Sequence, residues 1–118
     1  RRRKAAQLYR KLLGETRGIT LPFEARYGKH SYHIFAICVK NRDGVLEGLK
    51  KAGISAAVHY PVPLHLQEVY KNLRYKEGCL PVAEKICKEI LCLPIYTHIK
   101  REQIEYVCKK LKGLVING

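Results

Sequence analysis

The sequence contains no methionine, no apolar run long enough to cross a membrane, and no early apolar stretch that could form the core of a signal peptide. The longest strongly apolar runs, residues 34–39 and 54–58, fall far short of the ~20 residues that a spanning helix needs. The sequence therefore predicts neither a membrane span nor export. The missing methionine and the opening Arg1, inside a helical pattern, predict a fragment of a longer protein.

The sequence also lacks the cysteine pattern of a disulfide framework or a zinc site. It has five cysteines, an odd number, and no C-x-x-C pair; they are Cys38, Cys79, Cys87, Cys92 and Cys108. Each lies among apolar residues, where a reduced cysteine behaves as a small hydrophobic side chain. We therefore expect five thiols, no disulfide framework, no metal site, and a reducing, cytoplasmic compartment.

Acidic residues are scarce: 10 Asp and Glu stand against 23 Lys and Arg, which gives a formal net charge of +13. The basic residues are spread along the chain, so a solvated surface is the default interpretation. A functional interpretation is attraction of an anion, either nucleic acid or a phosphorylated small molecule. Because the sequence lacks a glycine-rich phosphate loop and a base-stacking aromatic pattern, a basic nucleic-acid-binding module remains only an alternative.

The length of 118 residues and a composition of 47% hydrophobic and 28% charged residues suit one compact domain. Periodicity and turn residues predict helices at 5–12, 41–53, 66–73, 81–90 and 100–113, and strands at 31–40, 54–59 and 91–95. A right-handed crossover would make the first two strands parallel, with the third between them and antiparallel. We therefore expect an α+β two-layer domain with a small three-stranded mixed sheet and helices packed on it.

The densest group of polar and aromatic side chains is the stretch His59-Tyr60-Pro61-Val62-Pro63-Leu64-His65. It places two imidazoles and a phenol at a strand end, on a loop that two prolines stiffen, and such loops commonly hold binding residues. The alternative is that the histidines only form hydrogen bonds in a buried turn. A zinc site is disfavoured because no ligand spacing connects this loop with a second cluster.

Read in order, the chain resembles the C-terminal part of the DegT/DnrJ/StrS family of sugar aminotransferases over almost its full length. The most specific stretch is Gly53-Ile54 followed by residues 59–67. The other landmarks are Arg2, Arg3, Ala6 and Tyr9, Tyr32-His33-Ile34-Phe35, Arg42-Asp43, Gly78, Pro81, Ala83-Glu84, Leu91, Leu93-Pro94-Ile95-Tyr96, Gln103-Ile104 and Val107. The chain departs from the family pattern at Ala56, Arg74 and Cys79-Leu80, and Ala56 removes a hydroxyl near the expected site.

The resemblance implies that residues 1–118 are the single small, C-terminal domain of a dimeric, fold-type-I enzyme dependent on pyridoxal phosphate. It implies transfer of an amino group, usually from glutamate, to a nucleotide-linked keto sugar. The large domain, which would hold the cofactor and its Schiff-base lysine, is absent from this chain, so we expect no catalytic residue here and no activity alone. The resemblance implies that His59, Tyr60 and His65 line the substrate cleft.

Two further alternatives stay open. The chain could be a non-catalytic interaction domain, or its family member could carry histidine in place of the Schiff-base lysine and catalyse dehydration. Alternation along residues 54–59 puts His59 on the face opposite Ile54 and Ala56. We therefore expect His59 at a strand exit, pointing away from the core toward the surface that the large domain would cover.

Overall fold

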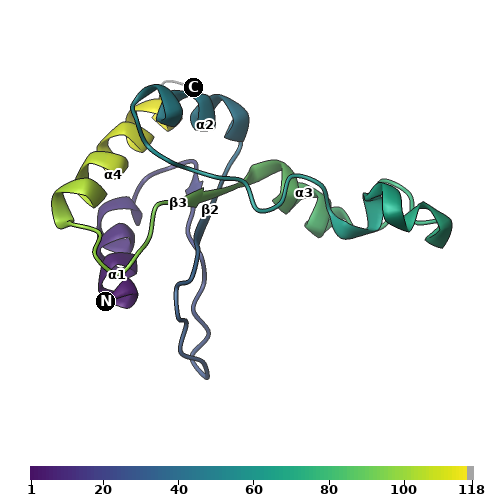
Figure 1. Ribbon diagram of the computed structural model, residues 1–118, viewed down its shortest axis with the longest axis horizontal. Helices are drawn as coiled ribbons and strands as arrows, with labels where there is room; N and C mark the ends of the chain where they lie inside the picture. The colour runs from purple at the N-terminus through teal and green to yellow at the C-terminus, as the bar shows by residue number, and fades with distance from the viewer. Residues whose placement is uncertain (117–118) are drawn as a thin grey trace.

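The computed structural model describes residues 1–116, which form a body of helices around a small sheet and an arm that extends to one side (Figure 1). The helices are α1 (Arg2–Leu13), α2 (Arg42–Lys51), α3 (Pro81–Glu89) and α4 (Arg101–Ile116). The strands are β1 (Ile19–Thr20), β2 (Phe35–Val39) and β3 (Ile90–Leu93). The arm, residues 60–80, contains the 3-10 turns η1 (Leu64–Leu66) and η2 (Glu68–Leu73). The α+β class with a three-stranded sheet is confirmed.

The sheet has the order β1-β2-β3, and each neighbouring pair is antiparallel. The prediction of a mixed sheet is therefore wrong. Residues 54–59 do not form a strand, since only Ala57 pairs with β3, through a bridge to Cys92. Even so, β3 lies between β2 and the Ala57 segment and is antiparallel to both, as predicted. The two-residue strand β1 was not predicted.

Local hydrogen bonds explain why residues 54–59 pair so little. The Ile54 amide donates to the Leu49 carbonyl at the end of α2, 2.9 Å away, and the Ala56 amide donates to the Ile54 carbonyl, 3.0 Å away. Both donors are thus used before the chain reaches the sheet. Pro61 then supplies no N–H group, which leaves Ala57 as the point of pairing.

The core lies on one face of the sheet, where Phe35, Ile37 and Val39 alternate with less buried residues along β2. Helices α1 and α2 each pack against α4 on this side, and α2 also contacts β2 and β3. The ring of Tyr9 stacks on Phe35 with 4.9 Å between centroids, and its hydroxyl donates to the Pro94 carbonyl at 2.8 Å. Burial raises the pKa of Tyr9 above its ordinary range.

The helices predicted at 5–12, 41–53, 81–90 and 100–113 are confirmed within three residues at each end. The exception is the segment 66–73, which lies in 3-10 turns. At its C-terminus α4 continues past Gly113 to Ile116. The helix continues because Leu114 and Val115 pack on the core. Leu114 lies against Gly48 of α2, where an added Cβ would meet its side chain at 2.4 Å, so the two helices approach each other closely.

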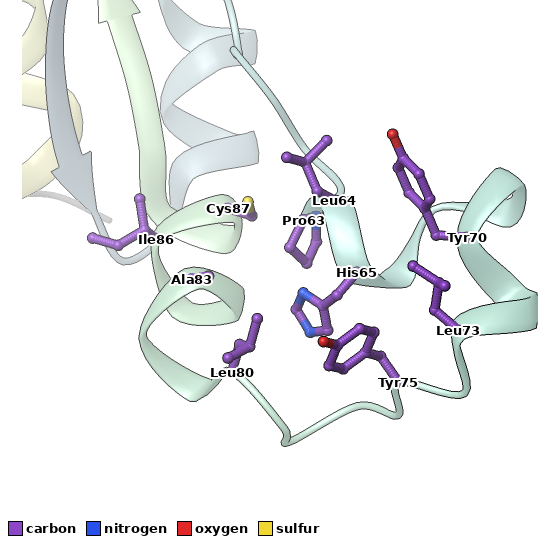
Figure 2. A pocket seen from close by; sticks show the side chains of 10 residues that line it. All are labelled: Pro63, Leu64, His65, Tyr70, Leu73, Tyr75, Leu80, Ala83, Ile86 and Cys87. Carbon is purple, nitrogen blue, oxygen red and sulfur yellow. The ribbon is translucent and has the colours of Figure 1, made fainter.

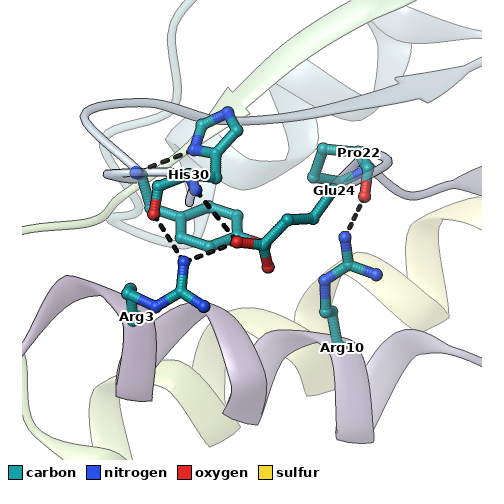
Figure 3. Close-up of polar contacts among 6 residues, drawn as sticks. Arg3, Arg10, Pro22, Glu24 and His30 are labelled. Carbon is teal, nitrogen blue, oxygen red and sulfur yellow. Dashed lines mark hydrogen bonds and ion pairs between the residues drawn. The ribbon is translucent and has the colours of Figure 1, made fainter. Parts of the chain in front are cut away.

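The segment between β1 and β2, residues 21–34, projects from the body and is anchored at its base to α1 (Figures 1 and 3). The Glu24 carboxylate accepts bonds from the His30 amide (2.9 Å), the Arg3 guanidinium and the Tyr32 hydroxyl (3.1 Å). The His30 amide, and then Arg3, lower the pKa of Glu24 to about 2. Beyond this anchor the ring of Tyr27 is 98% exposed.

No helix among residues 1–116 combines the length and the hydrophobicity that crossing a bilayer requires. The five cysteines are free thiols, and Cys92 and Cys108 are buried. The structure therefore contains no disulfide among these five residues.

We expect Tyr9→Phe to lower the free energy of unfolding by about 1–2 kcal/mol, because it removes the hydrogen bond from this fully buried side chain to the half-buried Pro94 carbonyl. Tyr106→Phe is the matched control, since its hydroxyl also donates to a backbone carbonyl, that of Ala52, but from an exposed side chain. The control should cost only a few tenths of a kcal/mol. Urea unfolding of the three proteins measures the difference, and equal losses would contradict the expectation.

We expect the anchor of residues 21–34 to be pH-dependent only in strong acid. Because the pKa of Glu24 falls from 4.5 to about 2 on folding, its contribution is complete above pH 4.5 and disappears as the pH falls through about 2. The NMR signal of the His30 amide should report this titration. Glu24→Gln should remove it, whereas Glu15→Gln, at an exposed position, should not. A midpoint near 4.5 would show that the anchor does not form.

Candidate functional site

The candidate site is the loop that leaves the sheet at Ala57 and enters the arm. Its first end is fixed by two backbone hydrogen bonds between Ala57 and Cys92 of β3. The Ala57 amide donates to the Cys92 carbonyl at 3.1 Å, and the Cys92 amide donates to the Ala57 carbonyl at 2.8 Å. Pro61 and Pro63 restrict the backbone that follows, and η1 begins at Leu64. The loop therefore runs from a strand edge into a stiffened turn.

His59 and Tyr60 lie at the exposed part of this loop. The two rings have centroids 5.4 Å apart, and the Tyr60 side chain is 71% exposed. Among the residues that the structure describes, neither side chain forms a hydrogen bond. Ile54 and Ala56 are buried whereas Ser55 and His59 are exposed, so the prediction that His59 points away from the core is confirmed, although it does not end a strand.

His65 occupies a different environment. Its side chain is 5% exposed, and Nε2 lies 2.9 Å from Oε1 of Glu84 on α3. The ring also meets Tyr75 edge to face, with 6.2 Å between centroids. The structure thus groups His59 with Tyr60 but places His65 in a buried pair, and a substrate contact by His65 stays a prediction.

Glu84 is the acceptor for several donors at the base of the arm. Its carboxylate accepts hydrogen bonds from three groups: the Gly78 amide, which lies 2.9 Å from both oxygens, the His65 imidazole, and the Leu80 amide at 3.2 Å. The Gly78 amide, and then His65, lower the pKa of Glu84 below its ordinary value, so the group is an anion at neutral pH. Glu84 therefore joins the arm to the first turn of α3.

Two hollows border this loop. Tyr60, Pro61 and Val62 line one of about 450 Å³. The other, of about 620 Å³, lies between the arm and α3 and is almost entirely apolar (Figure 2). Its walls are Pro63, Leu64, His65, Tyr70, Leu73, Tyr75, Leu80, Ala83, Ile86 and Cys87. The apolar face predicted for α3 therefore lines an open cavity, and the buried residue of that helix is Glu84.

The groups at the loop suit binding. An imidazole and a phenol can donate and accept hydrogen bonds and offer aromatic faces to a ligand. The described residues contain no group of three His, Cys, Asp or Glu that could hold a metal ion. Pyridoxal phosphate requires a lysine amine within an enclosed site, and no lysine lines either hollow. This site therefore does not fit the cofactor.

Sequence reasoning missed the importance of Glu84, which it noted only as a family landmark. A signal was present. Glu84 stands in the first turn of a helix that begins at Pro81, and an acidic side chain there can reach back to the free amides before the helix. What the sequence does not show is that His65, nineteen residues earlier, is its second partner.

Comparison with solved structures shows the class of the fold. The chain superimposes on DesV of S. venezuelae, solved in complex with a ketimine intermediate, with a TM-score of 0.92 and 34% identity; the match covers 96% of this chain and 30% of DesV. A sequence model of the DegT/DnrJ/EryC1/StrS aminotransferase family matches residues 1–112. The chain belongs to this family.

Curated relatives agree with this assignment. A pleiotropic regulatory protein of Geobacillus stearothermophilus is 45% identical over 112 residues, which are 93% of this chain and 30% of the relative. The dTDP-3-amino-3,4,6-trideoxy-alpha-D-glucose transaminase of Streptomyces venezuelae is 37% identical over 103 residues, 87% of this chain and 27% of the enzyme. The chain thus spans about 30% of the length of the relatives that it matches.

Proposed function

We propose that the chain is the small, C-terminal domain of a pyridoxal-phosphate-dependent aminotransferase that moves an amino group from glutamate to a nucleotide-linked keto sugar. Membership of the family and the alignment with about 30% of DesV support the domain assignment. The nucleotide-sugar substrate is supported by the name of the transaminase relative. In this proposal the large domain holds the cofactor, which acts as the electron sink.

The observation that carries the proposed site is the pair His59 and Tyr60. The two rings are exposed and lack hydrogen-bond partners in the described part of the chain, yet the backbone beneath them is fixed at Ala57. They also stand in the stretch with the most specific resemblance to the family. We assign substrate contact to these two residues. For His65 substrate contact stays only a prediction, because its ring is nearly enclosed and already bonded to Glu84.

In the intact enzyme, His59 would donate a hydrogen bond to a phosphate or sugar oxygen. Tyr60 would cover the sugar with its ring and orient it with its hydroxyl. A fixed loop loses little freedom when the ligand arrives, so these contacts are pre-organised. A homodimer and a cytoplasmic location complete the proposal, and the free thiols of the five cysteines support the location.

We expect His59→Ala in the intact enzyme to lower kcat/KM for the sugar nucleotide by roughly tenfold or more, the effect of losing one polar contact worth ~1.5 kcal/mol. Folding should be nearly unchanged because the side chain is exposed. His98→Ala, another exposed histidine, is the matched control and should have normal kinetics. Steady-state assays and thermal unfolding measure both effects. A variant that unfolds but shows no kinetic defect in its folded fraction would rule out the assignment.

Nucleic-acid binding is the alternative function, and a binding titration with DNA tests it. Binding of the isolated chain to duplex or single-stranded DNA at micromolar strength, with a steep dependence on salt, would favour that function. We expect only weak, non-specific binding, because the +13 charge is spread over the chain.

A further inference from the structure

We propose that Glu84 is a positioning residue: by holding His65 and the Gly78 and Leu80 amides, its buried carboxylate fixes the loop that presents His59 and Tyr60 to the substrate. This inference rests on the proposed function and adds a residue that touches neither substrate nor cofactor. It depends on how the two ends of the loop are held.

The distal end of the loop is held by Glu84. The carboxylate is 9% exposed and the imidazole of His65 is 5% exposed, so the pair is nearly closed to water. Oε1 accepts from His65 at 2.9 Å, and the same carboxylate accepts the Gly78 and Leu80 amides. Hydrogen bonds to a shielded anion are stronger than those between neutral groups. His65 is thereby fixed to α3.

The proximal end is held by β3. The paired amides and carbonyls of Ala57 and Cys92 anchor the backbone two residues before His59. Seven residues, 58–64, span the two anchors, and Pro61 and Pro63 remove much of their freedom. The Leu66 amide also closes back on the Pro63 carbonyl at 3.0 Å. The span is therefore short, stiff and fixed at both ends.

His59 and Tyr60 have no side-chain hydrogen bonds of their own within residues 1–116, so the two anchors determine where they lie. Releasing the distal anchor would let the span from Val58 onward move while the core stays intact. A misplacement of about 1 Å at a substrate contact can cost as much as the contact itself. Glu84 should thus affect substrate binding without touching the substrate.

Glu84→Gln tests the carboxylate with almost no change in volume. A glutamine keeps one acceptor oxygen but turns an NH₂ group toward donors, so it cannot satisfy His65 and both amides together. Glu77→Gln is the matched control: it removes the same charge from the residue next to Gly78, but Glu77 is 76% exposed and lies outside the pair.

In the intact enzyme we expect Glu84→Gln to raise KM for the sugar nucleotide roughly tenfold, with KM for the amino donor unchanged and Glu77→Gln normal. In an enzyme that already carries His59→Ala, Glu84→Gln should cost clearly less than it does in the unmodified enzyme, since one of the two contacts that Glu84 positions is already lost. Equal effects on both KM values, or fully additive losses, would indicate a merely structural role and overturn the proposal.

Hydrogen exchange of the isolated chain separates this inference from the proposed function. Glu84→Gln should speed exchange of the Gly78, Leu80 and Leu66 amides at least tenfold and leave the β2 amides unchanged. If it unfolds the whole chain, His65→Gln, which removes one bond of the cluster, should show the same local pattern. Unchanged exchange in the arm overturns the positioning role. If Glu84→Gln loosens the arm but His59→Ala leaves the kinetics of the intact enzyme unchanged, the proposed function is overturned, and with it the link between Glu84 and the substrate.

Discussion

The direct junction of α3 with β3 is the constraint on which the candidate site depends. Glu89 ends the helix and Ile90 begins the strand, with no residue between them. The strand carries Cys92, which pairs with Ala57, and the helix carries Glu84, which bonds His65. Both anchors of the loop thus belong to one continuous segment, which itself is held in the core by pairing of β3 with β2. The spacing of the anchors is therefore a property of the fold.

Much of this fold follows from local patterns in the sequence. Asn41 and Gly53 bracket α2, and the continuous apolar run of residues 34–39 contains the strand β2. Position 54 shows where such patterns fail. Ile54 looks like the start of a strand, but its amide completes the end of α2. The local hydrogen bond that closes the end of the helix overrides the strand propensity of the residue.

The candidate site was also predictable only as far as local sequence patterns define it. His59 and Tyr60 stand together in a recognisable stretch, and alternation correctly turns His59 outward. His65 belongs to the same stretch, but its environment depends on Glu84, which only the packing of the arm against α3 brings near. A pattern along the chain shows which groups are close in sequence, and it cannot show which buried acceptor a histidine meets nineteen residues later.

The anchored base of residues 21–34 has a consequence for what this part of the chain tolerates. Glu24 ties both sides of the segment to α1, so the path into β2 is set before the tip begins. The residues beyond that point, such as Gly28, meet almost nothing else. Natural insertions, or an engineered peptide tag, should therefore be accepted at the tip without shifting the register of the sheet.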